Sequence, residues 1–191
     1  FNPIHNGHLI IAHTFFELLG LDKLFFIPAN VSPFKIKSQK DFKENSHLRF
    51  QMVNLAVKSI ENYFVSNFEI NNNNPSYTIN TVTHFSKQFP NADFYWLLGG
   101  DQILQFDKWK DWEKILELVR LVVADRKDTF TTAQKKDLSN YYAKKGKPIF
   151  MDSPLIEISS TEIRERAQNS LSLRGYVPES VENFIFENKI Y

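Results

Sequence analysis

The stretch that decides the fold is residues 1–9, which read Phe-Asn-Pro-Ile-His-Asn-Gly-His-Leu. Pro3 cannot occupy a central strand, so any strand that precedes it must end there. From Gly7 onward, apolar residues recur at a period of 3.6, which predicts a helix over residues 7–19. Gly20 is then the expected cap at the end of that helix.

Two histidines lie at the start of this helix. His5 and His8 are three residues apart, so they share a face of the first turn, and Gly7 between them leaves the backbone open to approach. A helix N-terminus with two imidazole donors is a natural seat for a polyphosphate. The alternatives are two ordinary surface histidines or a zinc pair. The chain has no cysteine and no His-Glu-x-x-His motif, which disfavours a metal site.

Composition excludes several classes of protein. The chain has 191 residues, 42% of them hydrophobic and 24% charged, as expected for one globular domain over residues 1–191. A net charge of +1 gives no general attraction to nucleic acid or membranes. The absence of cysteine excludes disulfides and thiol catalysis. No signal peptide or membrane-spanning run is recognisable, so a cytoplasmic location is expected.

Short apolar runs alternate with helical repeats along the chain, which predicts βαβ units and an α/β fold with an open parallel sheet and helices on both faces. Strands are expected over residues 24–28, 63–70, 94–98, 121–124 and 148–151. Further helices are expected over residues 46–60, 76–89, 109–118, 131–142, 159–168 and 178–187, with 159–191 forming a C-terminal helical subregion.

Ligands bind such sheets at the carboxyl ends of the strands. Four segments are therefore candidates for the site: residues 1–8, 28–35, 99–101 and 158–164. In the last of these, Ser159 and Glu162 have the spacing of a capping box at a helix start. Ser160 and Thr161 add hydroxyls there, and Arg164 one turn later has a fork suited to phosphate oxygens. A well-capped helix with a solvated charged face is the alternative interpretation.

The two end segments together resemble the paired motifs of the nucleotidyltransferase superfamily with His-x-Gly-His. Within that superfamily the chain is similar to the nicotinate-nucleotide adenylyltransferase family over its whole length. The intermediate segments that carry the similarity are residues 30–35, Arg49, residues 75–78, residues 99–101, Trp109 and residues 177–191.

The resemblance implies a Rossmann-like nucleotidyltransferase that joins ATP to nicotinate mononucleotide, releases pyrophosphate and serves NAD biosynthesis. Catalysis is then expected from His5, His8 and Arg164. The ATP-binding residues it implies are Phe1, His5, His8, Gly99, Asp101, Ile158, Ser159, Ser160, Thr161 and Arg164. Mg²⁺ would arrive with ATP, held by phosphates and water, and no protein metal site is expected.

For nicotinate mononucleotide, the resemblance implies binding by Lys35, Arg49, Tyr77, Thr78 and Trp109. Four of the five have a plainer interpretation: Lys35 in a solvated loop, Tyr77 and Thr78 as a helix start, and Trp109 as core. Trp112 lies on the apolar face of the expected helix and should belong to the core, which leaves Trp109 available to stack on the pyridine ring. Asp101, expected on a ribose hydroxyl, also suits a helix N-cap.

The family begins with a central strand ending in glycines just before the residue that matches Phe1. We therefore expect such a strand upstream of Phe1. Phosphopantetheine adenylyltransferases fit less well, since they lack the long stretch between residues 101 and 158. A non-catalytic nucleotide sensor is disfavoured by the intact histidines and Arg164. A homodimer is left open.

Overall fold

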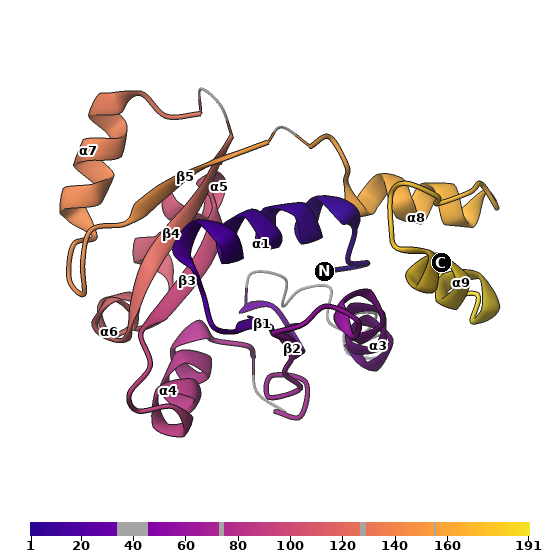
Figure 1. Cartoon of the computed structure of the whole chain (residues 1–191), viewed down its shortest axis with the longest axis horizontal. Coiled ribbons are helices and arrows are strands. Elements are labelled where there is room, and N and C mark those ends of the chain that lie inside the picture. The colour runs from indigo at the N-terminus through magenta and orange to yellow at the C-terminus, as the bar shows by residue number, and fades with distance from the viewer. Residues whose placement is uncertain (34–45, 73–74, 127–128, 155) are drawn as a thin grey trace. The chain divides into compact units, whose positions relative to one another are not determined.

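The computed structural model describes residues 1–33, 46–72, 75–126, 129–154 and 156–191. The chain divides into two compact units. Unit 1 comprises residues 1–75 and 156–191, and unit 2 comprises residues 76–155. Each unit combines parallel strands with helices (Figure 1), which confirms the α/β class. The single domain over residues 1–191 stays a prediction.

Unit 1 contains a strand pair and four helices among its described residues. The strands β1 (Leu24–Phe26) and β2 (Tyr63–Val65) are parallel, with Leu24 opposite Tyr63. The helices are α1 (Asn6–Leu19), α3 (Ser46–Val57), α8 (Ser160–Gln168) and α9 (Glu179–Glu187). Gly20 ends α1 in the left-handed conformation at φ 56°, as its expected role as a cap requires.

Aromatic and aliphatic side chains hold unit 1 together. The ring of Phe16 on α1 lies 5.4 Å from that of Tyr63, and Phe26 lies 5.7 Å from the same ring. Helix α3 packs against α9, where the Ser180 hydroxyl donates to the carbonyl of Leu55 at 3.1 Å. These contacts join residues from the two ends of the chain in one core.

Unit 2 contains a three-stranded sheet. Its strands β3 (Phe94–Gly99), β4 (Val119–Arg126) and β5 (Ile149–Ser153) are parallel, with β4 in the middle. The run Leu121–Val123 is buried throughout, as expected for a central parallel strand covered on both faces. The other elements are α4 (Thr78–Gln88), α5 (Gly100–Ile103), the 3₁₀ turn η2 (Phe106–Lys108), α6 (Trp112–Leu118) and α7 (Thr132–Tyr141).

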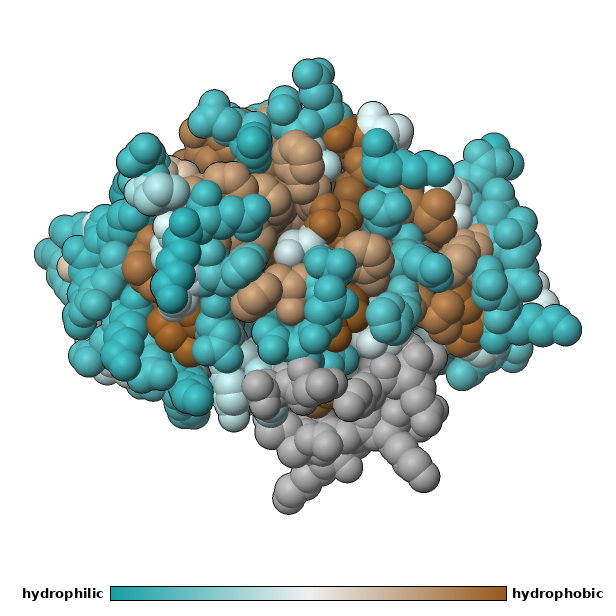
Figure 2. All heavy atoms as spheres, turned by 90° about the horizontal axis from the view of Figure 1, so that it is seen from below, coloured by the Kyte–Doolittle hydropathy of each residue, from teal (hydrophilic) through white to brown (hydrophobic). Residues whose placement is uncertain are grey.

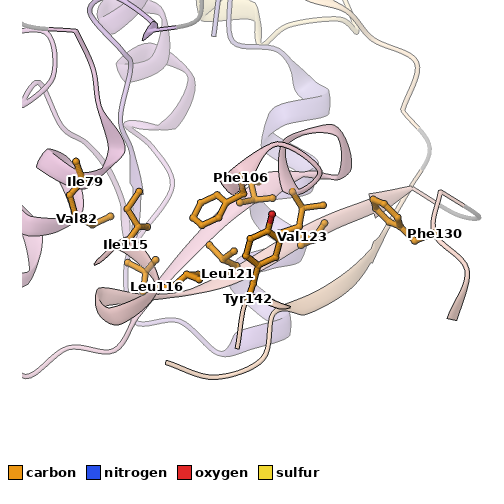
Figure 3. Close-up of a cluster of buried hydrophobic side chains, with 12 residues drawn as sticks. Ile79, Val82, Phe106, Ile115, Leu116, Leu121, Val123, Phe130 and Tyr142 are labelled. Atoms are coloured by element: carbon orange, nitrogen blue, oxygen red, sulfur yellow. The ribbon is translucent and has the colours of Figure 1, made fainter. Parts of the chain in front are cut away.

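The core of unit 2 is one cluster of apolar side chains from these elements (Figure 3). Phe106 makes two aromatic contacts in this core. Its ring centroid lies 5.1 Å from that of Trp109 and 5.5 Å from that of Tyr142. The cluster consists of Ile79, Val82, Leu98, Ile103, Phe106, Ile115, Leu116, Val119, Leu121, Val123, Phe130 and Tyr142.

Several predicted elements were wrong at their ends, for example the helix expected through Ile60, which ends at Val57, and two of them have a local physical reason. The strand expected over residues 63–70 stops at Val65, because the Ser66 hydroxyl accepts from the backbone N–H of Phe68 at 3.2 Å and turns the chain. The helix expected from Trp109 begins at Trp112 instead. Asp111, in the left-handed conformation at φ 51°, separates it from η2.

Hydrophilic and hydrophobic side chains are interspersed on the face that Figure 2 shows. Exposed large apolar residues come from separate elements, among them Ile10 and Leu18 on α1 and Phe186 on α9. Isolated apolar side chains of this kind are normal on a protein surface. Among the helices that the structure describes, none is both long and apolar enough to cross a bilayer.

Candidate active site

His5 and His8 form a close pair at the start of α1. His5 is the N-cap, and its backbone N–H donates to Nδ1 of His8 at 3.3 Å. The two ring centroids are 3.6 Å apart. Because Nδ1 of His8 accepts this bond, the ring proton of neutral His8 lies on Nε2 and can be donated to a ligand.

Gly7 is what allows the pair to lie so close to the backbone. A Cβ at this position would come within 3.1 Å of Nδ1 of His5 and within 3.3 Å of Cγ2 of Ile156. That Nδ1 is buried and has no hydrogen-bond partner among the described residues. A buried polar atom without a partner at a helix start is consistent with a site that a polar ligand completes.

Both histidines are neutral at physiological pH in the unliganded protein. Burial lowers the pKa of His5 to about 4 and the pKa of His8 to about 3, and for His8 the neighbouring His5 acts in the same direction. A phosphate ligand would therefore meet two imidazole rings that donate N–H groups without carrying charge. The positive charges that bind an anion therefore have to come from side chains other than these histidines.

These two histidines should make the fold sensitive to acid. Their folded pKa values lie below the unfolded value of about 6.5, so the unfolded chain binds more protons as the pH falls below 6.5. The contribution of these two histidines to the free energy of unfolding is therefore fully present above about pH 6.5, and it is lost progressively as the pH falls toward 4. In urea unfolding, we expect wild type to lose about 3–4 kcal/mol more between pH 7.5 and 5 than the variant with His5→Gln and His8→Gln, since each histidine contributes about 2 kcal/mol over this range.

An equal loss of stability in wild type and in the double variant would contradict the assignment of neutral, buried imidazoles.

The N-terminus of α8 contacts the segment that precedes this pair. The Ser159 hydroxyl accepts from the backbone N–H of Glu162 at 3.1 Å, which confirms Ser159 as the cap. The return bond expected from Glu162 is absent in the described part of the chain. The Ser160 hydroxyl instead donates to the carbonyl of Pro3 at 3.0 Å, across 157 positions of sequence. The two motifs predicted from opposite ends of the chain are thus in direct contact within unit 1.

Arg164 also takes part in this contact between the start of α8 and residues 2–3, which we call the junction. Its Nη1 donates to the carbonyls of Asn2 at 2.9 Å and Ser160 at 3.1 Å, and its Nη2 donates to the hydroxyl of Thr161 at 3.1 Å. These bonds use three of the five N–H donors of the guanidinium. Within the described residues, Nε–H and one N–H of Nη2 are left, and these two can grip two oxygens of a phosphate.

Arg49 supplies a second fixed cation in unit 1. It lies on α3, is only 3% exposed, and donates from Nη2 to the carbonyl of Asn30 at 3.0 Å. Asn30 is held in turn by its amide, which donates to the carbonyl of Asn72 at 2.8 Å. Burial lowers the pKa of Arg49, and the nearby Tyr191 raises it. The guanidinium remains charged, since an arginine pKa starts far above neutrality.

Two residues at this junction were missed by the sequence analysis. Asn2 accepts from Arg164 through its carbonyl, and its side-chain oxygen accepts from the Tyr191 hydroxyl at 2.9 Å. No spacing in the sequence pointed to them, because Asn2 and Tyr191 are 189 positions apart. A side-chain hydrogen bond over such a distance depends on the packing of the whole unit.

The remaining expected ATP residues of unit 1 lie beside these groups. The ring of Phe1 is 4.8 Å from that of His8 and perpendicular to it. Ile158 directly precedes the cap of α8 and is half-buried. Lys35 lies outside the described residues.

In unit 2, Gly99 and Asp101 lie at the carboxyl end of β3. Gly99 is the N-cap of α5, so Asp101 as N-cap was wrong, and Asp101 belongs to the first turn instead. A Cβ on Gly99 would come within 2.8 Å of Oδ1 of Asp101, so a larger residue there would displace that carboxylate from its present position. Oδ2 accepts from the amide of Gln102 at 2.7 Å, and the side chain is exposed. An exposed carboxylate at a strand end can accept hydrogen bonds from sugar hydroxyls.

Tyr77, Thr78 and Trp109 also belong to unit 2. Tyr77 is the N-cap of α4 and Thr78 its first residue, which confirms the helix start; Nζ of Lys110 lies 4.6 Å from the Tyr77 ring centroid. Trp109 and Trp112 are both half-buried against the core cluster, so the expected contrast between them was wrong. The reason is that Trp109 is in the turn after η2, not on the helix that carries Trp112.

The donors gathered in unit 1 suit an anion rather than a metal ion. They are imidazole, guanidinium and hydroxyl groups together with the N–H groups at two helix starts. No group of three or more His, Asp or Glu side chains that could hold a metal occurs in the parts of the chain that the structure describes.

Comparison with known proteins agrees with these features. The family model described as cytidylyltransferase-like matches residues 1–166. Two curated relatives, from Methylacidiphilum infernorum and Clostridium tetani, are both named "Probable nicotinate-nucleotide adenylyltransferase". They are 37% and 36% identical to the chain, cover all of it, and are themselves covered to 88% and 94%.

Among solved structures, nicotinic acid mononucleotide adenylyltransferase from Plasmodium falciparum, complexed with NaAD, has a similar fold. The TM-score is 0.71 at 18% identity, and the similarity covers 99% of this chain and 92% of that one. With more than four-fifths of the chain matched by the family model and full-length relatives above 30% identity, the chain belongs to the cytidylyltransferase-like family and, within it, to the nicotinate-nucleotide adenylyltransferases.

Proposed function

We propose that this enzyme transfers the adenylyl group of ATP to nicotinate mononucleotide, forming nicotinate adenine dinucleotide and pyrophosphate for NAD biosynthesis. The observation that carries the proposal is the contact between the two end motifs. Arg164 donates to the carbonyl of Asn2, and Ser160 donates to the carbonyl of Pro3. Unit 1 thus combines an imidazole pair, with His5 buried and His8 half-buried, two helix N-termini and a fixed guanidinium, as a polyphosphate site needs.

The reaction is a displacement at phosphorus. An oxygen of the mononucleotide phosphate attacks the α-phosphorus of ATP, the bond between the α-phosphorus and the bridging oxygen breaks, and pyrophosphate leaves with the electron pair. The attacking phosphate is already ionised near pH 7, so no general base is required. The enzyme has to hold two anions close together and stabilise the charge that accumulates on the leaving group.

The side chains of unit 1 suit these tasks. His8, with its proton on Nε2, and His5 would donate to the ATP phosphates without carrying charge in the free enzyme. Arg164 would hold the leaving pyrophosphate with its two remaining donors, together with the N–H groups and hydroxyls at the start of α8. Mg²⁺ would be held by the phosphates and water, and it would supply further charge neutralisation there.

For the acceptor, we assign the mononucleotide phosphate to Arg49, with Lys35 as a further cation. Asp101 would accept hydrogen bonds from a ribose. Trp109 would stack on the pyridine ring, and the N–H groups at the start of α4 with the Thr78 hydroxyl would donate to the nicotinate carboxylate. A cytoplasmic location and a homodimer remain predictions from the sequence.

The proposal predicts a preference for the acid substrate. An amide in place of the carboxylate would turn an NH₂ group toward donors and leave buried groups unpaired. We expect kcat/KM for nicotinate mononucleotide to exceed that for nicotinamide mononucleotide by at least about tenfold. The measurement is pyrophosphate release from ATP with each acceptor in turn.

Two variants sharpen this test. Thr78→Ala should reduce the preference, whereas Trp109→Ala should weaken both substrates about equally, because stacking does not distinguish acid from amide. Equal kcat/KM for the two acceptors in wild type would refute the acid pocket. Pyrophosphate release from ATP with phosphopantetheine as acceptor, and not with nicotinate mononucleotide, would refute the proposed substrate.

A further inference from the structure

Tyr191 lies where the two ends of unit 1 meet, and the sequence assigned it no role beyond its place in the similar segment 177–191. Its hydroxyl donates to the side-chain oxygen of Asn2 at 2.9 Å. The carbonyl of the same Asn2 accepts from Nη1 of Arg164 at 2.9 Å. One residue therefore connects the tyrosine hydroxyl to the guanidinium that we assign to the leaving pyrophosphate.

Burial and two nearby arginines have opposite effects on the Tyr191 hydroxyl. Burial raises the pKa of Tyr191 well above its ordinary value, and both Arg164 and Arg49 oppose that effect. The phenol oxygen thus lies in the field of both arginines, and its O–H dipole points to Asn2 rather than to either of them. Tyr191 stays neutral and protonated, so it acts as a fixed donor and not as a charge.

The orientation of Arg164 depends on this arrangement. Nη1 is shared between the carbonyls of Asn2 and Ser160, and only the Ser160 bond is local to α8. Nη2 is also held locally, by the hydroxyl of Thr161, so the Asn2 bond is the one among these three that fixes the guanidinium against a residue outside α8. Asn2 precedes α1, and the Tyr191 hydroxyl anchors its side chain rather than its peptide, so it restrains the carbonyl of Asn2 through the residue as a whole.

We infer that Tyr191 is a positioning residue for the reaction: by holding Asn2, it helps to keep Arg164 oriented for the leaving pyrophosphate. This inference rests on the proposed function for the role of Arg164. The contacts that carry it are those of Tyr191, Asn2 and Arg164.

The experiment measures pyrophosphate binding by titration calorimetry, which requires no turnover. Tyr191→Phe keeps the ring and removes only the hydroxyl. We expect it to weaken pyrophosphate binding about five- to tenfold, the effect of losing one hydrogen bond in a network around a charged group. Asn2→Ala should weaken binding to a similar extent, and the double variant should be no weaker than the worse single variant.

Two comparisons separate positioning from a merely structural role. In an Arg164→Ala background, Tyr191→Phe should have no further effect on pyrophosphate binding. Tyr63→Phe is the matched control, because the Tyr63 hydroxyl pairs with Nδ1 of His13 at 3.1 Å in the same unit, away from Arg164. That variant should bind pyrophosphate like wild type. Thermal unfolding of each variant confirms that it is folded.

The inference is overturned if folded Tyr191→Phe binds pyrophosphate as tightly as wild type, if the loss persists undiminished in the Arg164→Ala background, or if wild type does not bind pyrophosphate. Wild type that binds pyrophosphate but does not adenylylate nicotinate mononucleotide would refute the proposed function alone. The two failures are thus distinguishable.

Discussion

Replacing Arg164 by alanine should lower kcat by about a hundredfold or more while the protein stays folded, because the lost donors act on charge that develops on the leaving pyrophosphate. Removing one fixed donor to a transition-state oxyanion typically costs this much. Arg164→Lys should recover only part of the activity, since an ammonium group cannot replace the fork of Nε–H and Nη2–H.

His8→Ala should have an effect of the same order, about a hundredfold on kcat, for a related reason. The neutral ring donates from Nε2, and its Nδ1 also accepts from the backbone N–H of His5. The variant therefore loses a donor to phosphate and the local bond that holds the start of α1.

Both variants have matched controls in unit 1. Arg174 is exposed, and His13 is exposed on α1, where Nε2 lies 3.3 Å from Glu17. Arg174→Ala and His13→Ala should keep wild-type kcat in the pyrophosphate-release assay. If folded Arg164→Ala or His8→Ala keeps a third or more of wild-type kcat, the role assigned to that side chain is wrong.

The largest effect on stability is expected at Lys135, which reaches from α7 to the sheet of unit 2. Its Nζ lies 2.7 Å from Oδ2 of Asp125, a side chain on β4 that is 2% exposed, and 5.9 Å from the ring of Phe150. None of the residues of α7 is itself fully buried, so this ion pair is a principal link between that helix and the sheet.

Lys135→Ala should therefore destabilise the protein by about 2–3 kcal/mol, because it leaves a carboxylate buried without its cation. This estimate lies below the usual cost for a fully buried pair, since Lys135 is 32% exposed and water can approach it. Urea unfolding at neutral pH provides the measurement.

The neighbouring Lys136→Ala is the control, because that side chain is exposed on the same helix. Replacing both partners, with Asp125→Asn and Lys135→Met, should recover part of the loss, since no charge is then left buried. If Lys135→Ala is no less stable than Lys136→Ala, the ion pair does not hold α7 to the sheet.

Local sequence determined the start of each helix that matters for the site. His5 and His8 are three residues apart and close the first turn of α1, and Ser159 caps α8 through the N–H of Glu162. Such bonds form between residues three or four positions apart, so spacing and residue type are sufficient to predict them. The alternation of apolar runs and helical repeats likewise predicted the parallel α/β fold.

Tertiary structure alone decided how these motifs are used. The contacts of Arg164 and Tyr191 with Asn2 join residues 162 and 189 positions apart. The low pKa values of the histidines result from burial, which depends on what packs over them. Such long-range contacts and burial follow from packing of distant segments, which no local pattern encodes. For the same reason, the sequence could predict a phosphate site at residues 1–8 and 158–164 but not the part played by Asn2 and Tyr191.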